Sequence, residues 1–153
     1  MQKFFDDYLK NLNELHDDVR SAIEGLPQTA LDWTPYPGFN SISVLTVHIA
    51  GAERFWLSDV IAGIDSGRDR EAEFQVRNLE PEVLMGRLTD SWGFVQGVLA
   101  ELTLQDLNAK CISPRDGREV TVGWALGHVL KHTALHVGHI QITCQLWGNQ
   151  SGN

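Results

Sequence analysis

Four of the six histidines in this 153-residue chain lie within twelve consecutive residues. They are His128, His132, His136 and His139. In an α-helix, residues four positions apart lie one turn apart on the same face, so this run predicts a stripe of imidazoles. Two imidazoles at this spacing can direct their nitrogens at one metal ion. The run offers two such pairs, His128 with His132 and His132 with His136, and the spacing alone favours neither.

A metal site needs a third ligand, which must come from another helix. His48 is the candidate, because its neighbours in the sequence are apolar and it is therefore expected to be buried. The alternative for the histidine run is a set of polar core residues bonded to loop carbonyls, or a pH-sensitive surface. His16, which stands beside two aspartates, is predicted to lie on the surface and not to bind the metal. Neither pair has the His-Glu-x-x-His form, so a zinc protease is not predicted.

Composition and charge limit the classes of protein to consider. Hydrophobic residues make up 42% and charged residues 21% of the chain, which is typical of a globular domain. The net charge of −8 repels nucleic acid and anionic lipid surfaces, so neither is expected as a partner. The sequence shows no signal peptide and no apolar run long enough for a membrane span, so we expect a cytoplasmic protein. The length predicts a single domain over residues 1–150.

Apolar residues at helical spacing predict four long amphipathic helices. They cover residues 3 to about 25, 41 to 62, 81 to about 102, and 121 to 147. Ser41 and Thr121 are plausible N-caps, and Pro81 suits the first turn of a helix. Four such helices, each roughly 30 Å long, predict an all-α protein built as a four-helix bundle.

The predicted connections differ in character. Residues 26–40 contain three of the five prolines and should form a long ordered loop, anchored by burial of Trp33, Tyr36 and Phe39. Residues 65–74 are polar and should be exposed. Residues 113–119 predict a turn around Asp116 and Gly117.

Five further side chains have weaker signals. Glu53, five positions after His48, can face solvent or accept a hydrogen bond from a ligand imidazole, and we expect the second, structural role. Arg115 and Arg118 could bind an anionic thiol cofactor, but a solvated turn is the expected role. Cys111 and Cys144 match no metal or redox motif and are predicted to be reduced thiols.

Two segments of the chain contain motifs that are typical of one protein family. The first runs from Leu31 to Trp56, with a tryptophan-proline loop, a serine-led helix start and His48 in the second turn. The second, residues 127–140, resembles a motif in which a histidine, three residues and a second histidine precede x-Gly-Gln. Together the two segments resemble the DinB/YfiT-like superfamily. This chain has His139 where the family often has glutamine, and Val137 where an arginine usually stands.

The resemblance implies a four-helix bundle of up-down-down-up topology, commonly dimeric, in which three histidines hold a divalent metal such as zinc or nickel. Carried over to this chain, the implied ligands are His48, His132 and His136, which leaves His128 and His139 as neighbours of the site. The implied partners are a second copy of the chain and a small-molecule substrate.

The resemblance also implies a choice of activities. Members of the family include thiol-dependent S-transferases and isomerases that use bacillithiol, mycothiol or glutathione, and others are described as metal-dependent hydrolases. A third alternative is a metal-binding stress-response protein without turnover. No side-chain nucleophile or general base is recognisable in the sequence, so the expected reactive group is a metal-bound water or thiol.

Overall fold

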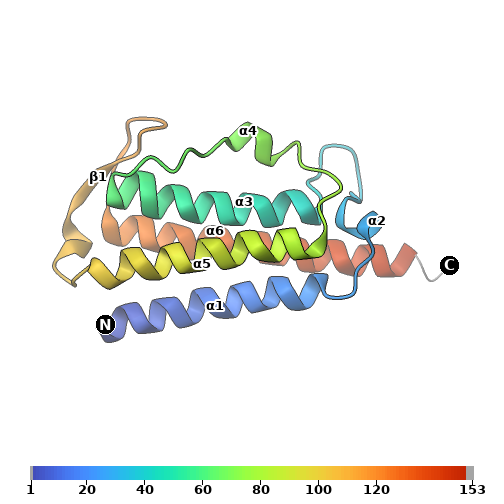
Figure 1. Ribbon diagram of the computed structural model, residues 1–153, viewed down its shortest axis with the longest axis horizontal. Coiled ribbons are helices and arrows are strands. Elements are labelled where there is room, and N and C mark those ends of the chain that lie inside the picture. Colours follow the sequence, from blue (N-terminus) through green and yellow to red (C-terminus); the bar gives the residue numbers. More distant parts are fainter. Residues whose placement is uncertain (1, 151–153) are drawn as a thin grey trace.

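The computed structural model describes residues 2–150, and four long helical segments lie side by side in it (Figure 1). They are α1 (Lys3–Ile23), α3 (Ile42–Arg54) with its π-helical continuation η1 (Phe55–Ala62), α5 (Pro81–Glu101) and α6 (Val122–Gln150). Helices α1 and α6 run in one direction and α3 and α5 in the other (Figure 1). The predicted all-α four-helix bundle and its up-down-down-up order are therefore confirmed.

Short elements lie in the connections between the long helices. They are α2 (Gln28–Leu31), α4 (Arg70–Glu73), the 3₁₀ turn η2 (Asp106–Asn108), and the strands β1 (Lys110–Ile112) and β2 (Glu119–Thr121). Because α3 and α5 are parallel, residues 63–80 must return along the length of the bundle, and α4 lies partway along this crossover (Figure 1). The two strands pair antiparallel with Cys111 opposite Val120, and they enclose the predicted turn at residues 113–118.

The long helices begin where the sequence predicts. The Ser41 hydroxyl accepts a hydrogen bond from the Val44 amide at 3.2 Å, which caps α3. The Thr121 hydroxyl accepts a hydrogen bond from the Trp124 amide at 3.1 Å, which caps the start of α6. Pro81 is the first residue of α5, where its missing amide hydrogen costs no bond. At the far end of η1 the chain turns at Gly63, whose φ of 67° suits a residue without a side chain.

The core consists of two groups of buried apolar residues, one toward each end of the bundle. The first joins the start of α1 to η1 and the start of α6. The second joins the end of α1 to α2, α3 and the start of α5. The histidine positions of α6 lie between these two apolar regions, so the polar groups of the site are held by packed helices on both sides.

The loop of residues 26–40 is anchored differently from the prediction. Tyr36 and Phe39 are 68% and 60% exposed, so the predicted burial of these two rings is wrong. They contact each other instead, with ring centroids 6.0 Å apart. The loop is held by Ala30 and Leu31 of α2, which are fully buried, and by Trp33, which is half-buried with its ring centroid 5.7 Å from that of Trp147.

Both cysteines are free thiols, as predicted. Burial raises the pKa of each, so neither is an activated nucleophile. Within residues 2–150, no helix is both long enough and apolar enough to span a lipid bilayer.

Candidate metal centre

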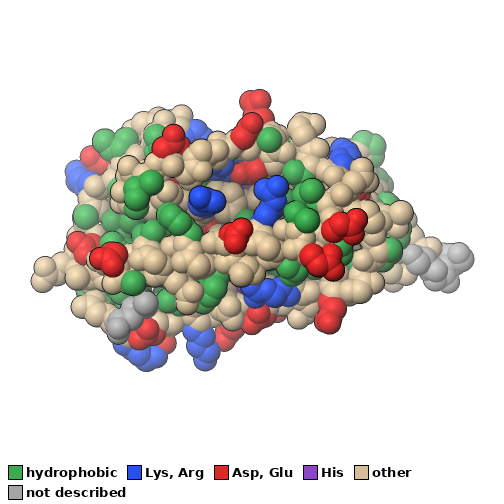
Figure 2. Space-filling view, in the orientation of Figure 1, with side chains coloured by type: hydrophobic (Ala, Val, Ile, Leu, Met, Phe, Trp, Pro, Cys, Tyr) green, Lys and Arg blue, Asp and Glu red, His purple; other side chains and the backbone are tan. Residues whose placement is uncertain are grey.

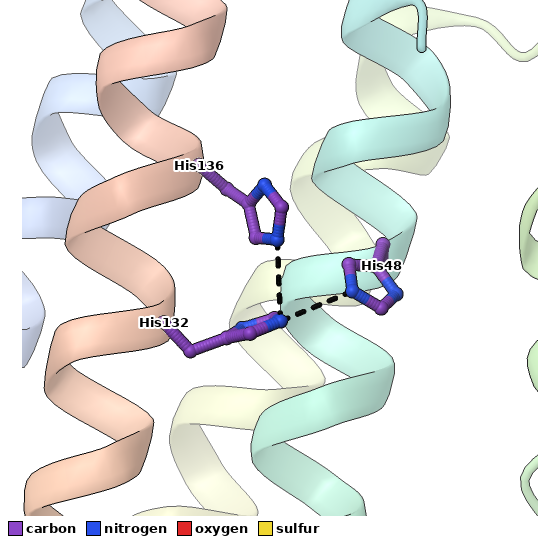
Figure 3. Close-up of side chains that lie close together, drawn as sticks. All are labelled: His48, His132 and His136. Carbon is purple, nitrogen blue, oxygen red and sulfur yellow. Dashed lines mark hydrogen bonds between the residues drawn. The ribbon is translucent and has the colours of Figure 1, made fainter. Parts of the chain in front are cut away.

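Three histidines from two helices converge between α3 and α6. His48 projects from α3, and His132 and His136 project from α6 toward it (Figure 3). The Nε2 atom of His132 lies 3.1 Å from that of His48 and 3.2 Å from that of His136. Zinc–nitrogen bonds of 2.0–2.1 Å in tetrahedral geometry separate the ligand nitrogens by about 3.3 Å. These two separations match those of nitrogens on one metal ion, and all three ligand atoms lie within 4.8 Å of one another.

Hydrogen bonding alone explains this convergence less well. A neutral imidazole nitrogen carries either one hydrogen or one lone pair, so it can form only one well-directed hydrogen bond. The Nε2 atom of His132 approaches two other ring nitrogens at once. A cation that all three lone pairs share satisfies the whole group.

The protonation of these rings also suits a metal. Burial, reinforced by the neighbouring histidines, lowers the pKa of His132 to about 3. Burial and the positive charge that His48 and His139 can carry lower the pKa of His136 to about 4. Both rings are therefore neutral at physiological pH, and the neutral imidazole is the form that binds metals.

The crossover supplies a buried carboxylate that orients His48. Oε2 of Glu73 lies 2.8 Å from Nδ1 of His48, and both side chains are buried. Such a carboxylate holds a hydrogen on Nδ1 and leaves the Nε2 lone pair for the metal. Arg68 in turn donates to both oxygens of Glu73, from Nε at 2.5 Å and from Nη2 at 2.8 Å. Burial opposes ionisation of Glu73, but the bonds from Arg68 and His48 outweigh it and lower the pKa of the carboxyl.

The backbone of α3 has room for this carboxylate because Gly51 faces it. A Cβ atom at position 51 would lie 2.0 Å from Oε1 of Glu73, closer than any real contact. Any side chain there would push Glu73 away from His48. Gly51 thus helps to position His48 by leaving room for Glu73.

The sequence prediction that residues 65–74 are exposed is wrong for Arg68 and Glu73. These residues lie against α3 because their opposite charges satisfy each other once the crossover folds back over the bundle. Sequence reasoning missed both. A local signal exists, because Asp69 accepts a hydrogen bond from the Ala72 amide and starts a helical turn that aims Glu73 inward.

The crossover also covers a cavity that is separate from the histidine cluster. The face of the molecule in Figure 2 shows no histidine side chain, and it is hollowed between Lys and Arg side chains near its middle. A cavity of about 440 Å³ there is lined by Arg54, Arg68, Arg87 and Glu73, among others. Glu73 therefore separates this cavity from His48.

Replacing Glu73 by glutamine will weaken binding of zinc or nickel by about tenfold to a hundredfold, the usual cost of losing a partner of a ligand imidazole. The amide lacks the negative charge that orients the Nδ1 hydrogen of His48 and draws Arg68 inward. Isothermal titration of metal into the two proteins measures the difference. Glu71→Gln removes an exposed carboxylate of α4 two residues away and is the matched control. Equal affinities for Glu73→Gln and Glu71→Gln would show that Glu73 does not support the metal.

Glu53 accepts no hydrogen bond from the three convergent histidines, contrary to its expected role. It lies at the centre of a second polar group, in which each of the four long helices contributes one buried side chain. Its oxygens lie 2.9 and 3.1 Å from Nε2 of His16, and they accept hydrogen bonds from Ser91 at 2.6 Å and Thr133 at 2.9 Å. We call these four residues the interior Glu53 cluster.

The prediction that His16 lies on the surface is wrong. His16 is fully buried in α1, facing Glu53, although two aspartates follow it in the sequence. Those aspartates are exposed because they lie on the opposite face of the helix. The prediction that His16 is not a ligand agrees with its place in the interior Glu53 cluster.

The remaining two histidines lie beside the three that converge. His128 stacks on Trp124, with ring centroids 5.0 Å apart and an interplanar angle of 10°. His139 is exposed, and its Nδ1 lies 3.4 Å from Nδ1 of His136. Within the described residues, the group whose ligand atoms all lie within 4.8 Å of one another consists of His48, His132 and His136.

Comparison with known proteins agrees with this architecture. A sequence profile of the DinB superfamily matches residues 11–140, which is most of the chain. No curated protein sequence gives a match.

Solved structures with the same fold include three informative relatives. A conserved protein from Enterococcus faecalis aligns with a TM-score of 0.80 at 16% identity, over 95% of this chain and 98% of that one. YfiT from Bacillus subtilis, described as a probable metal-dependent hydrolase with an unusual four-helix bundle topology, gives a TM-score of 0.76 at 22% identity, over 97% and 90%.

The third is a mutant of the mycothiol-dependent maleylpyruvate isomerase, with a TM-score of 0.65 at 14% identity, over 90% of this chain and 62% of that one. Identities this low show a shared fold, whereas the sequence profile shows the family. This chain is a member of the DinB superfamily.

Proposed function

We propose that this protein is a metal-dependent S-transferase that uses a low-molecular-weight thiol of the bacillithiol, mycothiol or glutathione type. The observation that carries the proposal is the convergence of His48, His132 and His136, which offers three protein ligands to one divalent ion, zinc or nickel. A three-histidine metal site keeps a coordination position for a small molecule, and the ion lowers the pKa of a thiol or water bound there.

Different residues of the chain would have different roles in such a site. His48, His132 and His136 would hold the ion through their ring nitrogens, and Glu73 fixes the orientation of His48. His132 and His136 are only partly buried, so a small molecule can approach them from solvent. The interior Glu53 cluster ties α3 and α6 together directly beneath the site, since Thr133 follows His132 in the chain.

The solved relatives support two versions of this chemistry. The isomerase with the same fold depends on a thiol cofactor, which favours thiol activation. YfiT is described as a probable metal-dependent hydrolase, and the alignment covers 90% of its chain, against 62% of the isomerase chain. Hydrolysis is therefore the second candidate. A metal-binding protein without turnover, acting in a stress response, is the third.

The experiment that separates these candidates compares metal-loaded wild-type protein with His132→Ala. Each is incubated with a thiol and 1-chloro-2,4-dinitrobenzene as a model electrophile, then with ester and amide substrates. A transferase consumes thiol and electrophile only in the wild type. Hydrolysis of esters or amides without thiol consumption would favour the second candidate, and no turnover in either assay would favour the third.

We further propose that the protein is a cytoplasmic homodimer whose partners are small molecules and not nucleic acids. An apolar stripe on α6 supports self-association: Leu135, Ile142 and Leu146 are 56%, 50% and 38% exposed and share one face of the helix. The net charge of −8 supports the absence of nucleic acid.

Ile142→Glu is expected to convert the dimer to a monomer, because a charge in the middle of an apolar interface is costly to bury. Light scattering coupled to size exclusion measures the mass. Gln141→Glu adds the same charge to the adjacent position off the stripe, and it should remain dimeric. A monomeric wild type, or equal masses for the two variants, would contradict the proposed interface.

A further inference from the structure

The turn between β1 and β2 holds two arginines against aromatic rings. The guanidinium of Arg118 lies 4.6 Å from the ring centroid of Trp124 and 5.7 Å from that of Trp56. The guanidinium of Arg115 lies 5.9 Å from the centroid of Phe55. The turn fixes these positions, since the Arg118 amide donates to Asp116 and its carbonyl accepts from the Ser113 amide. The expectation of a solvated turn is therefore incomplete, because both arginines are docked on rings.

The same rings lead directly to the histidine cluster. Trp124 stacks on His128. The ring centroid of His128 lies 4.7 Å from that of Trp56 and 5.8 Å from that of His132. Phe55 and Trp56 belong to the π-helical segment η1, whose wider turn is a feature often found at functional sites. A continuous row of rings thus runs from Arg118 to His132. Trp124 is 42% exposed and His128 and His132 are half-buried, whereas Trp56 is buried beneath them.

The length of this row of rings sets the size of a molecule that could lie along it. Trp124 and His132 are eight positions apart on α6, a rise of about 12 Å along the helix. A single small anion cannot touch both ends. An extended molecule of about tripeptide size can place one group at the histidine cluster and another at Arg118.

The charge around this row of rings is positive although the chain is acidic overall. The guanidinium of Arg68 also lies near Phe55, 5.6 Å from its ring centroid, and its Nη2 lies 3.4 Å from Nδ1 of His48. Lys131, Arg118 and Arg115 all act electrostatically on His128, where burial and then these charges lower the pKa.

Two carboxylates contact these cations. Glu73 forms the buried pair with Arg68, and Asp116 lies 3.8 Å from Arg115 in an exposed contact. Within residues 2–150 the guanidinium of Arg118 donates to no carboxylate within 4.0 Å, so its N–H groups can donate to a ligand.

We propose that Arg118, assisted by Arg115, recognises a carboxylate of an extended anionic thiol whose other end reaches the histidine cluster. This inference rests on the proposed function and assigns its substrate class. The aromatic rings beneath the guanidiniums hold them in place, and Trp124, which is 42% exposed, offers a flat surface for the body of the ligand. A guanidinium binds a carboxylate through paired hydrogen bonds, so it selects an anionic thiol over a neutral one.

Glutathione and its diethyl ester test this assignment, because they share the thiol and differ in their carboxylates. In isothermal titration into zinc-loaded wild-type protein, glutathione should bind more tightly than its diethyl ester, by about tenfold or more. This is the difference expected for a charged hydrogen bond. In Arg118→Gln that preference should shrink to about twofold or less, while binding of the ester stays unchanged. Arg87→Gln removes an exposed arginine of α5, in the half of the bundle away from the turn, and should keep the wild-type preference.

Other outcomes separate this inference from the proposed function. Equal binding of acid and ester by the wild type, or equal weakening of both by Arg118→Gln, would overturn the carboxylate assignment and leave thiol activation intact. S-methylglutathione keeps both carboxylates but cannot form a thiolate. If it binds as tightly as glutathione and loses affinity in Arg118→Gln, the arginine assignment stands and the thiol-dependent function fails. Binding of none of the three compounds would overturn both.

Discussion

Replacing Glu53 by alanine will destabilise the protein by about 3–5 kcal/mol, because it leaves several buried polar groups without a partner, at about 1–3 kcal/mol each, and creates a cavity. The substitution leaves His16, Ser91 and Thr133 with buried polar atoms and no acceptor, and it opens a void where four helices meet. For a domain of this size the loss lowers the melting temperature by about 10 °C. Thermal unfolding followed by circular dichroism measures the change.

Two further variants make this result specific. Glu14→Ala removes an exposed carboxylate of α1 and should change the stability by less than about 0.5 kcal/mol. Glu53→Gln keeps the shape and one acceptor oxygen, so it should lie between Glu53→Ala and the wild type. If Glu53→Ala melts like Glu14→Ala, the interior Glu53 cluster does not hold the helices together.

Added zinc or nickel will raise the melting temperature of the wild-type protein, because a ligand that binds only the folded state stabilises it by mass action. At a free metal concentration 100 times Kd the gain is about 2.7 kcal/mol, or about 5–10 °C for this chain length. His132→Ala removes the nitrogen that approaches both other ligands, and it should abolish the response.

The neighbouring histidines provide the control for this experiment. His139→Ala removes an exposed imidazole from the same helix, outside the convergent group, and should retain most of the metal response. A response that falls equally in His132→Ala and His139→Ala would indicate weak binding by the whole histidine stripe and not a defined site.

Much of the fold follows from local features of the sequence. Apolar spacing identifies the long helices, and Ser41, Pro81 and Thr121 mark where three of them begin, because caps and first-turn prolines act within one turn of the chain. The direction of the helices came from the family resemblance, since nothing local in residues 63–80 says that they must cross the whole bundle.

The convergence of His48 with His132 and His136 could also be anticipated from the resemblance, and the structure brings these three together. The residues that support these histidines could not be anticipated from the resemblance. Arg68 and Glu73 belong to a polar stretch whose burial depends on mutual charge neutralisation after the crossover has folded back. His16 and Glu53 are 37 positions apart, and each looks like a surface residue until the other is placed beside it. Pairing between distant polar groups leaves no periodic signal in a single sequence.

The central claim is that the three histidines hold a metal ion in the folded protein. Metal analysis of protein purified without a histidine tag tests it most directly, with wild type and His132→Ala prepared side by side. We expect about one divalent metal ion, zinc or nickel by our proposal, per wild-type chain and almost none in His132→Ala. Equally little metal in both proteins, together with identical melting temperatures, would contradict the site.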